Sequence, residues 1–305
     1  MAAFGFTSLL IHSNNSPFMI RSLLPTLLAS SFLTLGTLHG AGLPDDLKTG
    51  GFAIGAQCWS FNKFTVFEAI DKTAKAGGKV VEFFPGQKLS PEESNVKFDH
   101  NSPPEVVQKV KAKCAEAHVQ PIAYGVVGIP KDEAGARKVF EFAKALGIRV
   151  INTESVDALD TAEKLVKEYD IKVGIHDHPR RPDDPNYKVW DPNYVLSVTK
   201  DRDPRMGSCA DVGHWVRSGL KPLDCIRILK GRIMSSHLKD LNAPLPSAHD
   251  VPYGEGVSDI KGILDEYKAQ GFDGPISVEY EYKMEDNLAE VTKCIDFVRA
   301  YGAGK

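Results

Sequence analysis

The feature that most constrains the fold is an alternation of short β-rich runs with longer amphipathic runs, repeated eight times after Asp45. In the amphipathic runs apolar residues recur every three or four positions, as in 103–117, where Val106, Val110 and Cys114 share a stripe. This alternation predicts parallel strands with right-handed crossovers, and eight units predict a closed (β/α)8 TIM barrel of the α/β class. The predicted strands are residues 53–59, 79–84, 119–126, 149–154, 172–178, 206–212, 232–238 and 275–281.

Helix boundaries support the same division of the chain. Asp132 and Ser258 precede amphipathic runs as expected N-caps, and Gly147 and Gly271 follow those runs as expected C-terminal residues. An open doubly wound sheet is the alternative fold, but no predicted strand is followed by G-x-G-x-x-G. A barrel of about 250 residues is commonly one domain, so we predict a single barrel domain over residues 42–305.

The N-terminus differs in kind from the rest of the chain. From Met1 to Pro44 there is no Asp, Glu or Lys, and Arg21 is the only Arg. We interpret residues 1–41 as a signal peptide, with a second candidate start at Met19, and expect an exported protein, periplasmic or secreted. A membrane anchor is the rival interpretation, but the apolar run is short and contains Pro25. We therefore expect no stable membrane span in the mature chain.

Charge and cysteine content exclude several classes of protein. The formal net charge is -3, and no basic block of five residues occurs, which argues against nucleic acid as a partner. The five cysteines show no C-x-x-C spacing, so we expect small buried apolar residues and neither a disulfide scaffold nor a zinc cage. They are Cys58, Cys114, Cys209, Cys225 and Cys294.

Ionisable residues gather where the predicted strands end. Side chains alternate along a strand, and the apolar set should face the helices, which turns the other set toward the barrel axis. The long loops 179–191 and 240–257 both follow strands, which predicts a working face at the carboxyl ends of the barrel. The inward residues at or near the strand ends include Glu154, His176, His178, Asp211, His237, Lys239, Glu279 and Glu281.

Burying so many charges without a partner would cost several kcal/mol each, about as much as a whole domain's stability. A divalent cation resolves this problem because it accepts carboxylates and neutral imidazole together. We predict that Glu154, Asp211, His237 and Glu279 bind a metal. The carboxylate-rich set favours Mn2+ or Mg2+, with Co2+ or Zn2+ as further candidates.

Other residues near the rim have two interpretations each. Glu82 either contacts substrate or forms an ordinary salt bridge, and His214 either serves the site or caps the next helix. His176 and His178 are either substrate-binding residues or hydrogen-bonded core histidines. Trp59 either stacks on a sugar face or packs the rim.

Several of these segments together resemble the xylose isomerase-like TIM-barrel superfamily, in its sugar phosphate isomerase/epimerase branch. The resemblance covers roughly residues 50–302, and it implies that Glu154, Asp211, His237 and Glu279 are the ligands of a divalent metal. One departure is His176-Asp177-His178-Pro179, where many epimerases carry a Glu-Pro or Glu-x-x-Asn segment. The segments that carry the resemblance are Glu154, 209–214, 236–240, 251–256 and 277–281.

The resemblance implies a metal-dependent sugar isomerase or epimerase that abstracts a proton next to a carbonyl through a metal-stabilised enediolate. Glu154 and Glu279, on opposite sides of the predicted barrel, are the expected base and acid. A small carbohydrate is the expected partner, with a homo-oligomer left open. Two alternatives remain: a metal-dependent 3-keto-glycoside lyase or hydrolase, and a non-catalytic exported sugar-binding barrel. The expected substrate-binding residues are His214, His176, His178, Lys239, Trp59 and Glu82.

Overall fold

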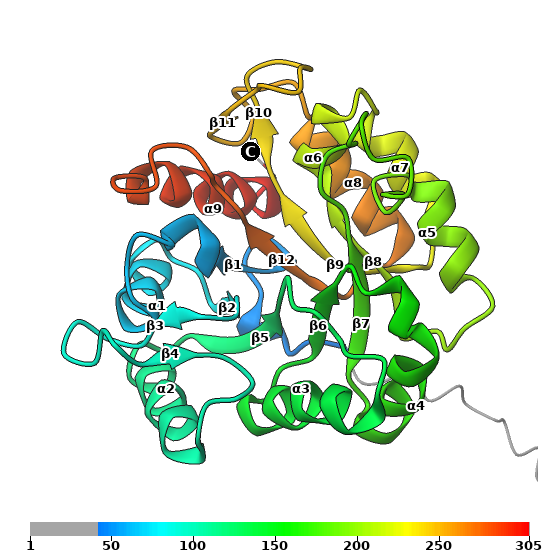
Figure 1. The fold of residues 1–305 in the computed structure, drawn as a ribbon. Helices are drawn as coiled ribbons and strands as arrows, with labels where there is room; N and C mark the ends of the chain where they lie inside the picture. The colour runs from blue at the N-terminus through cyan, green and yellow to red at the C-terminus, as the bar shows by residue number, and fades with distance from the viewer. Residues whose placement is uncertain (1–41, 305) are drawn as a thin grey trace, which may run out of the picture. The chain divides into compact units, whose positions relative to one another are not determined.

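The computed structural model describes residues 42–304 and shows one closed barrel of parallel strands (Figure 1). Going round the barrel, the strands follow the order of the chain, and the last of them pairs with the first. The predicted (β/α)8 barrel is therefore confirmed. Its strands are β1 Ala53–Gln57, β2 Val80–Phe83, β5 Gln120–Tyr124, β6 Val150–Thr153, β7 Lys172–His176, β8 Met206–Asp211, β9 Ile233–Leu238 and β12 Pro275–Val278.

Nine α-helices of the described residues surround the strands (Figure 1). The Asp132 carboxylate accepts the N–H of Gly135 at 2.8 Å and caps α3, and Gly147 ends that helix at φ 77, both as predicted. The helices are α1 Val66–Lys75, α2 Pro104–Glu116, α3 Glu133–Leu146, α4 Leu159–Tyr169, α5 Pro192–Thr199, α6 Val212–Arg217, α7 Pro222–Ile228, α8 Ile260–Gln270 and α9 Leu288–Gly302.

The N-cap predicted for α8 was wrong by one residue. Asp259, not Ser258, caps this helix, and its carboxylate accepts the N–H of Gly262 at 3.1 Å. Ser258 is buried, and its own N–H donates to the Asp240 carboxylate at 3.0 Å. The serine therefore belongs to the preceding loop, whose conformation Asp240 fixes.

Short elements complete the loops between strands and helices. The strands β3 Gln87–Lys88 and β4 Lys97–Phe98 form one antiparallel pair after β2, and β10 Asp240–Leu241 and β11 Asp250–Val251 form another after β9. Single turns of 3-10 helix occur at η1 Asp45–Leu47, η2 Cys58–Phe61 and η3 Val156–Ala158. The β10–β11 pair lies within the predicted long loop 240–257, on the carboxyl side of the barrel.

The barrel interior is apolar at one end and ionisable at the other. Near the amino ends of the strands, Ala53, Val80, Ile122, Val150 and Met234 form a buried cluster, with Leu43 packed against them. A larger core lies between the strands and the helices and contains four of the five cysteines. All five cysteines are buried and free, which confirms the prediction that they form no disulfide among the described residues.

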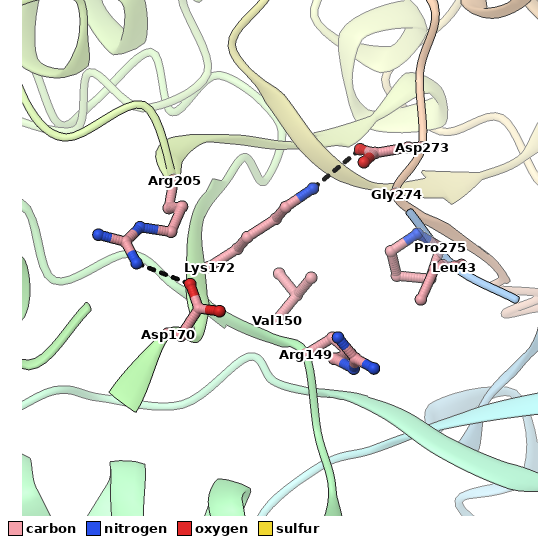
Figure 2. Close-up of a pocket in the computed structure, with 9 residues that line it drawn as sticks. All are labelled: Leu43, Arg149, Val150, Asp170, Lys172, Arg205, Asp273, Gly274 and Pro275. Carbon is pink, nitrogen blue, oxygen red and sulfur yellow. Dashed lines mark hydrogen bonds and ion pairs between the residues drawn. The ribbon is translucent and has the colours of Figure 1, made fainter. Parts of the chain in front are cut away.

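A small cavity opens at the amino ends of the strands, beside Leu43 and Val150 (Figure 2). Ion pairs form part of its wall: Lys172 to Asp273 at 2.8 Å and Arg205 to Asp170 at 2.6 Å. Its volume of about 60 Å³ is too small for a sugar, since ligand pockets run to about 300 Å³ or more. This face of the barrel is a packed and ion-paired end.

The predicted signal peptide, residues 1–41, lies outside the described residues, so export and the boundary at residue 42 stay predictions. Within residues 42–304, no helix has the length and apolar content needed to cross a bilayer.

Candidate metal and sugar site

Four side chains from neighbouring strands converge at the carboxyl end of the barrel. They are His176 at the end of β7, Asp211 at the end of β8, His237 in β9 and Glu279 just after β12. Each offers one ligand atom, and these four atoms lie within 4.8 Å of one another. Strand register explains the meeting, because β8 and β9 pair Asp211 directly with His237. The four residues are buried and form a candidate metal site, which we call the His-Asp-His-Glu cluster.

Unsatisfied polar atoms show that this cluster suits a cation. Both ring nitrogens of His176 are buried without a hydrogen-bond partner among the described residues, and Oδ2 of Asp211 faces the ammonium of Lys239 at 2.9 Å. Buried polar atoms are normally hydrogen-bonded. Unpaired imidazole nitrogens that lie close to further ligand atoms therefore fit a metal ion. Nδ1 of His237 faces Glu279 at 3.1 Å, while its Nε2 lies 3.0 Å from Oε1 of Glu82. A carboxylate behind a ligating histidine is the usual support of a metal-bound imidazole.

Glu82 is placed behind the cluster rather than beside an open cavity. Its carboxylate is fully buried and accepts hydrogen bonds from Nδ2 of Asn152 at 2.7 Å and Oγ of Ser277 at 2.6 Å. With His237 as a third neighbour, its oxygens are occupied. This arrangement makes Glu82 a residue that orients the ring of His237. Whether Glu82 also contacts substrate, as the sequence analysis proposed, stays a prediction.

Lys239 is buried among the carboxylates of the site. Its Nζ lies 2.9 Å from Asp211 and 2.8 Å from both Glu279 and Glu281. Burial alone would lower the pKa of Lys239, but the three carboxylates outweigh it and hold that pKa well above the usual range. The ammonium therefore stays charged and balances part of the negative charge at the mouth of the barrel.

The carboxylates of the cluster are ionised for the same reason. Burial opposes ionisation of Glu279, but Lys239 and His237 outweigh it and lower its pKa. Burial likewise opposes ionisation of Asp211, but the nearby His214 ring and Lys239 ammonium again lower its pKa. Ionised carboxylates are the form that ligates a metal.

Glu154 lies next to the His-Asp-His-Glu cluster and forms a second group with His176, the last residue of β7, and His178, two residues beyond it. Its Oε1 is hydrogen-bonded to Nδ1 of His178 and lies 3.5 Å from Nδ1 of His176. Burial would raise the pKa of Glu154, but the neighbouring His176 and His178 rings lower it overall. The structure thus groups His176 with Asp211, His237 and Glu279, and the predicted ligand role of Glu154 stays a prediction.

His214 is not the cap of α6, and its role in the site stays a prediction. Its backbone N–H donates to Oδ1 of Asp211 at 2.8 Å, so Asp211 caps α6 through this residue. Its ring stacks on His178 with centroids 5.1 Å apart, and its Nε2 lies 3.6 Å from Oδ2 of Asp211. Burial lowers the pKa of His214 well below its usual value, so the ring is neutral and can accept or donate a hydrogen bond at the mouth.

Trp59 lies on η2, directly after β1, and is 39% exposed. Its ring meets Phe84 edge-on at 5.0 Å between centroids. The indole is therefore supported from one side and available from the other. Its stacking on a sugar stays a prediction.

Sequence reasoning missed Tyr187 and Asp177. Tyr187 lies in loop 179–191, where no periodicity marks it; its hydroxyl accepts the N–H of His178 at 2.8 Å and donates to Glu154 at 2.9 Å. Asp177 is buried and accepts the N–H of Asp211 at 3.0 Å. Burial and the charge of Asp211 raise the pKa of Asp177 well above its usual value. The length of the loop was the one available signal for Tyr187.

An eight-stranded α/β barrel with ionisable side chains at the carboxyl ends of its strands has the layout of a TIM-barrel enzyme. The model of the xylose isomerase-like TIM barrel family matches residues 70–301, so the chain belongs to this family. The resemblance identified from the sequence is thereby confirmed.

Three known proteins illustrate the relationship. A protein of known structure from Parabacteroides distasonis is 30% identical, with a TM-score of 0.65 over 82% of this chain and 98% of that one. L-ribulose 3-epimerase has the same fold at 15% identity, with a TM-score of 0.61 over 82% of this chain and 94% of that one. L-ribulose-5-phosphate 3-epimerase UlaE of Escherichia coli is 37% identical over 71 residues, which are 23% of this chain and 24% of that one. The match thus spans about a quarter of this curated relative.

Proposed function

We propose that the protein is a divalent-metal-dependent sugar isomerase or epimerase. The observation that carries the proposal is the His-Asp-His-Glu cluster, with its orphaned ligand atoms, at the carboxyl end of a barrel of this family. The names of the relatives support a carbohydrate substrate, since one acts on L-ribulose and another on its 5-phosphate. The expected ligands are His176, Asp211, His237 and Glu279, with Glu154 as an outer neighbour.

The ligand types guide the choice of metal. Two imidazoles and two carboxylates make a more nitrogen-rich set than the one predicted from the sequence. Imidazole suits Zn2+, Co2+ and Mn2+ better than Mg2+, which prefers oxygen ligands and retained waters. We therefore propose Mn2+, Co2+ or Zn2+ in preference to Mg2+. A divalent ion bound there supplies Lewis-acid stabilisation of the negative charge that develops on substrate oxygens.

The protein groups supply the proton transfers. Isomerisation or epimerisation removes a proton from the carbon next to a carbonyl and returns one to the same or the neighbouring carbon. Glu279 follows β12 and Glu154 follows β6, and these strands lie four positions apart in the ring of eight. Two carboxyl groups on opposite sides of the mouth suit this transfer: the ionised one takes a proton from one face of the sugar, and the other, when it carries a proton, returns one on the opposite face. We further propose that Lys239 and His214, whose Nζ and Nε2 lie 3.3 Å apart, contact a substrate oxygen at the mouth.

Exchange of carbon-bound hydrogen with solvent tests the proposal directly. The metal-loaded protein is incubated with D-fructose, D-ribulose or L-ribulose in D2O, and deuterium at carbons 1 and 3 is measured by NMR. We expect exchange at one of these carbons, lost on chelation and restored by Mn2+. Absence of exchange with all three ketoses and with their phosphates, in the presence of bound metal, would overturn the assignment as an isomerase or epimerase.

A second candidate is a lyase acting on 3-keto-glycosides, and His178 favours it. The His178 side chain is 44% exposed and is held by Glu154, which suits an acid that protonates a leaving group. In this reaction a base removes the proton at carbon 2, a double bond forms between carbons 1 and 2, and the carbon 1–oxygen bond breaks. The released oxygen takes a proton from the acid, so atoms and charge balance. Release of an alcohol from a 3-keto-glucoside without added oxidant distinguishes this reaction from isomerisation.

A further inference from the structure

The loop after β7 and the start of α5 line a pocket, and one of the lining residues, Tyr187, also contacts Glu154 next to the His-Asp-His-Glu cluster. The pocket has a volume of about 490 Å³, within the usual range for small-molecule sites. Arg180, Arg181 and Lys188 supply cations to its lining, and Tyr187, Trp190 and Tyr194 supply aromatic rings. Nothing in the proposed reaction uses these six residues except the hydroxyl of Tyr187.

The pocket is built on an anchored loop. Val189 is 4% exposed and packs into the core between strands and helices, which fixes the middle of the loop. The backbone N–H of Arg180 donates to Oγ of Ser218 at 2.9 Å, and the N–H of Asp191 donates to the carbonyl of Lys188 at 3.0 Å. The walls are therefore positioned by packing and hydrogen bonds at several points.

The cations of the pocket have aromatic rather than acidic neighbours. The guanidinium of Arg181 lies 3.8 Å from the ring centroid of Tyr187, and that of Arg180 lies 5.0 Å from the ring of Trp190. Within residues 42–304 no carboxylate forms an ion pair with Arg180, Arg181 or Lys188. Guanidinium groups stacked on rings keep their N–H donors free at the edge, which suits a carboxylate or a phosphate.

The acidic side chains of the pocket are already engaged. Asp184 accepts the N–H of Asn186 at 3.1 Å, and Asp191 accepts the N–H of Asn193 at 2.9 Å as the cap of α5. Three cations against these two carboxylates leave a net positive pocket. A neutral sugar would use the rings alone, whereas an anionic one would use both the rings and the cations.

Tyr187 contacts both the pocket and the residues of the proposed reaction site. Its ring lies under Arg181, while its hydroxyl contacts Glu154 and the backbone of His178. A ligand that reaches from the cluster past Tyr187 would enter the pocket.

We propose that this pocket is a subsite for an anionic substituent, a carboxylate or a phosphate, on the part of the sugar remote from the reacting carbons. The inference rests on the proposed function for the location of the reacting carbons. Arg180 and Arg181 bind the anion, and Tyr187 and Trp190 pack against the sugar chain beside it. The substrate class is thereby narrowed from ketoses in general to acidic ketoses.

Binding of three matched sugars tests the inference. D-fructose, D-fructuronate and D-fructose 6-phosphate differ only at carbon 6, which is a hydroxymethyl, a carboxylate or a phosphate ester. Their dissociation constants are measured by calorimetry on the full chain loaded with Mn2+. We expect at least one anionic sugar to bind about 10- to 100-fold tighter than D-fructose. The tighter of the two identifies whether the anion is a carboxylate or a phosphate.

Substitution assigns this preference to the loop. Replacing both arginines, Arg180→Gln and Arg181→Gln, should abolish the preference and leave the affinity for D-fructose unchanged. Arg149→Gln is the matched control, because Arg149 lies at the opposite, amino end of the barrel. Equal affinity for all three sugars in the wild type, or a preference unchanged in the double variant, would overturn the subsite.

Solvent exchange separates this inference from the proposed function. Deuterium exchange into the three sugars without any anionic preference in binding leaves the isomerase standing and removes the subsite. An anionic preference that depends on the two arginines, without exchange into any sugar, supports the subsite and counts against the isomerase.

Discussion

The two ends of the barrel differ in how completely their polar and charged groups are paired. At the amino ends of the strands, Arg205 pairs with Asp203 and Asp170, and Lys172 pairs with Asp273. At the carboxyl ends, His176 keeps both ring nitrogens unsatisfied, and Arg181 has no acidic partner within residues 42–304. Charges that are paired within the protein serve stability, whereas charges left unpaired are available to an ion or a substrate. The amino end of the barrel is therefore filled by its own ion pairs, whereas the carboxyl end has polar groups available to a ligand.

This difference predicts that substitutions at the carboxyl end impair activity and that those at the amino end reduce stability. The largest effect is expected for Glu279→Gln, which removes a charge that the proposed proton transfer requires. Turnover should fall by about 10²- to 10⁴-fold. The readout is the rate of deuterium exchange, with metal content and thermal midpoint measured alongside. Retained exchange at near wild-type rate would remove Glu279 from the acid/base role.

The next effect distinguishes His176 from Glu154 as the metal ligand. We expect His176→Ala to weaken metal binding by more than about 100-fold, because a direct ligand is lost, and Glu154→Gln to weaken it by only about tenfold. Affinity is measured by competition with a chelator. The reverse order would restore Glu154 to the ligand set and assign His176 to an outer position.

A smaller effect, on stability, is expected at the amino end. Arg205→Ala removes ion pairs to Asp203 at 2.8 Å and to Asp170 at 2.6 Å. Partly exposed pairs of this kind contribute about 1 kcal/mol, so the free energy of unfolding in urea should fall by about that amount. Exchange activity and metal affinity should not change. A loss of activity as large as that of a rim variant would contradict the division between the two ends.

The smallest expected effect is the response of the amino end to acid. Hydrogen bonds from Arg205 lower the pKa of Asp203 to about 2, against about 3.9 for a free aspartate. Because the folded pKa is depressed, the stabilisation is present above about pH 4 and is lost as the pH falls toward about 2. Unfolding free energies compared at pH 5 and pH 3 should show a larger drop in the wild type than in Arg205→Ala. Equal drops would mean that this pair contributes nothing to acid sensitivity.

Much of the fold was predictable because it depends on local patterns. The eight strands were located correctly, and their predicted ends ran one to three residues too far at Glu154, His178 and Glu281. The alternation of apolar and ionisable residues continues beyond the last hydrogen bond between strands. The sequence pattern therefore does not mark where a strand ends and its loop begins. The same ambiguity moved the α8 cap from Asp259 to Ser258, since both residues are good N-caps.

The candidate site was predictable in its composition but not in its pairings. Asp211, His237 and Glu279 were assigned together from strand parity, and the structure brings them together. The alternation of side chains along a strand could not decide between Glu154 and His176, because both side chains face the barrel axis. Their positions along that axis depend on the stagger between strands. Tyr187 was missed because it reaches the site from a loop without periodicity.

The sequence by itself determined the eight-fold alternation, the sidedness of each strand and the end of the barrel that carries the ionisable groups. These follow from side-chain periodicity and from burial, which act within a few residues of one another. The tertiary structure alone decided that His176 joins Asp211, His237 and Glu279, and that Tyr187 separates their site from the pocket of Arg180 and Arg181. Those contacts join residues far apart in the chain, so they are set by barrel closure and strand register, which no local pattern encodes.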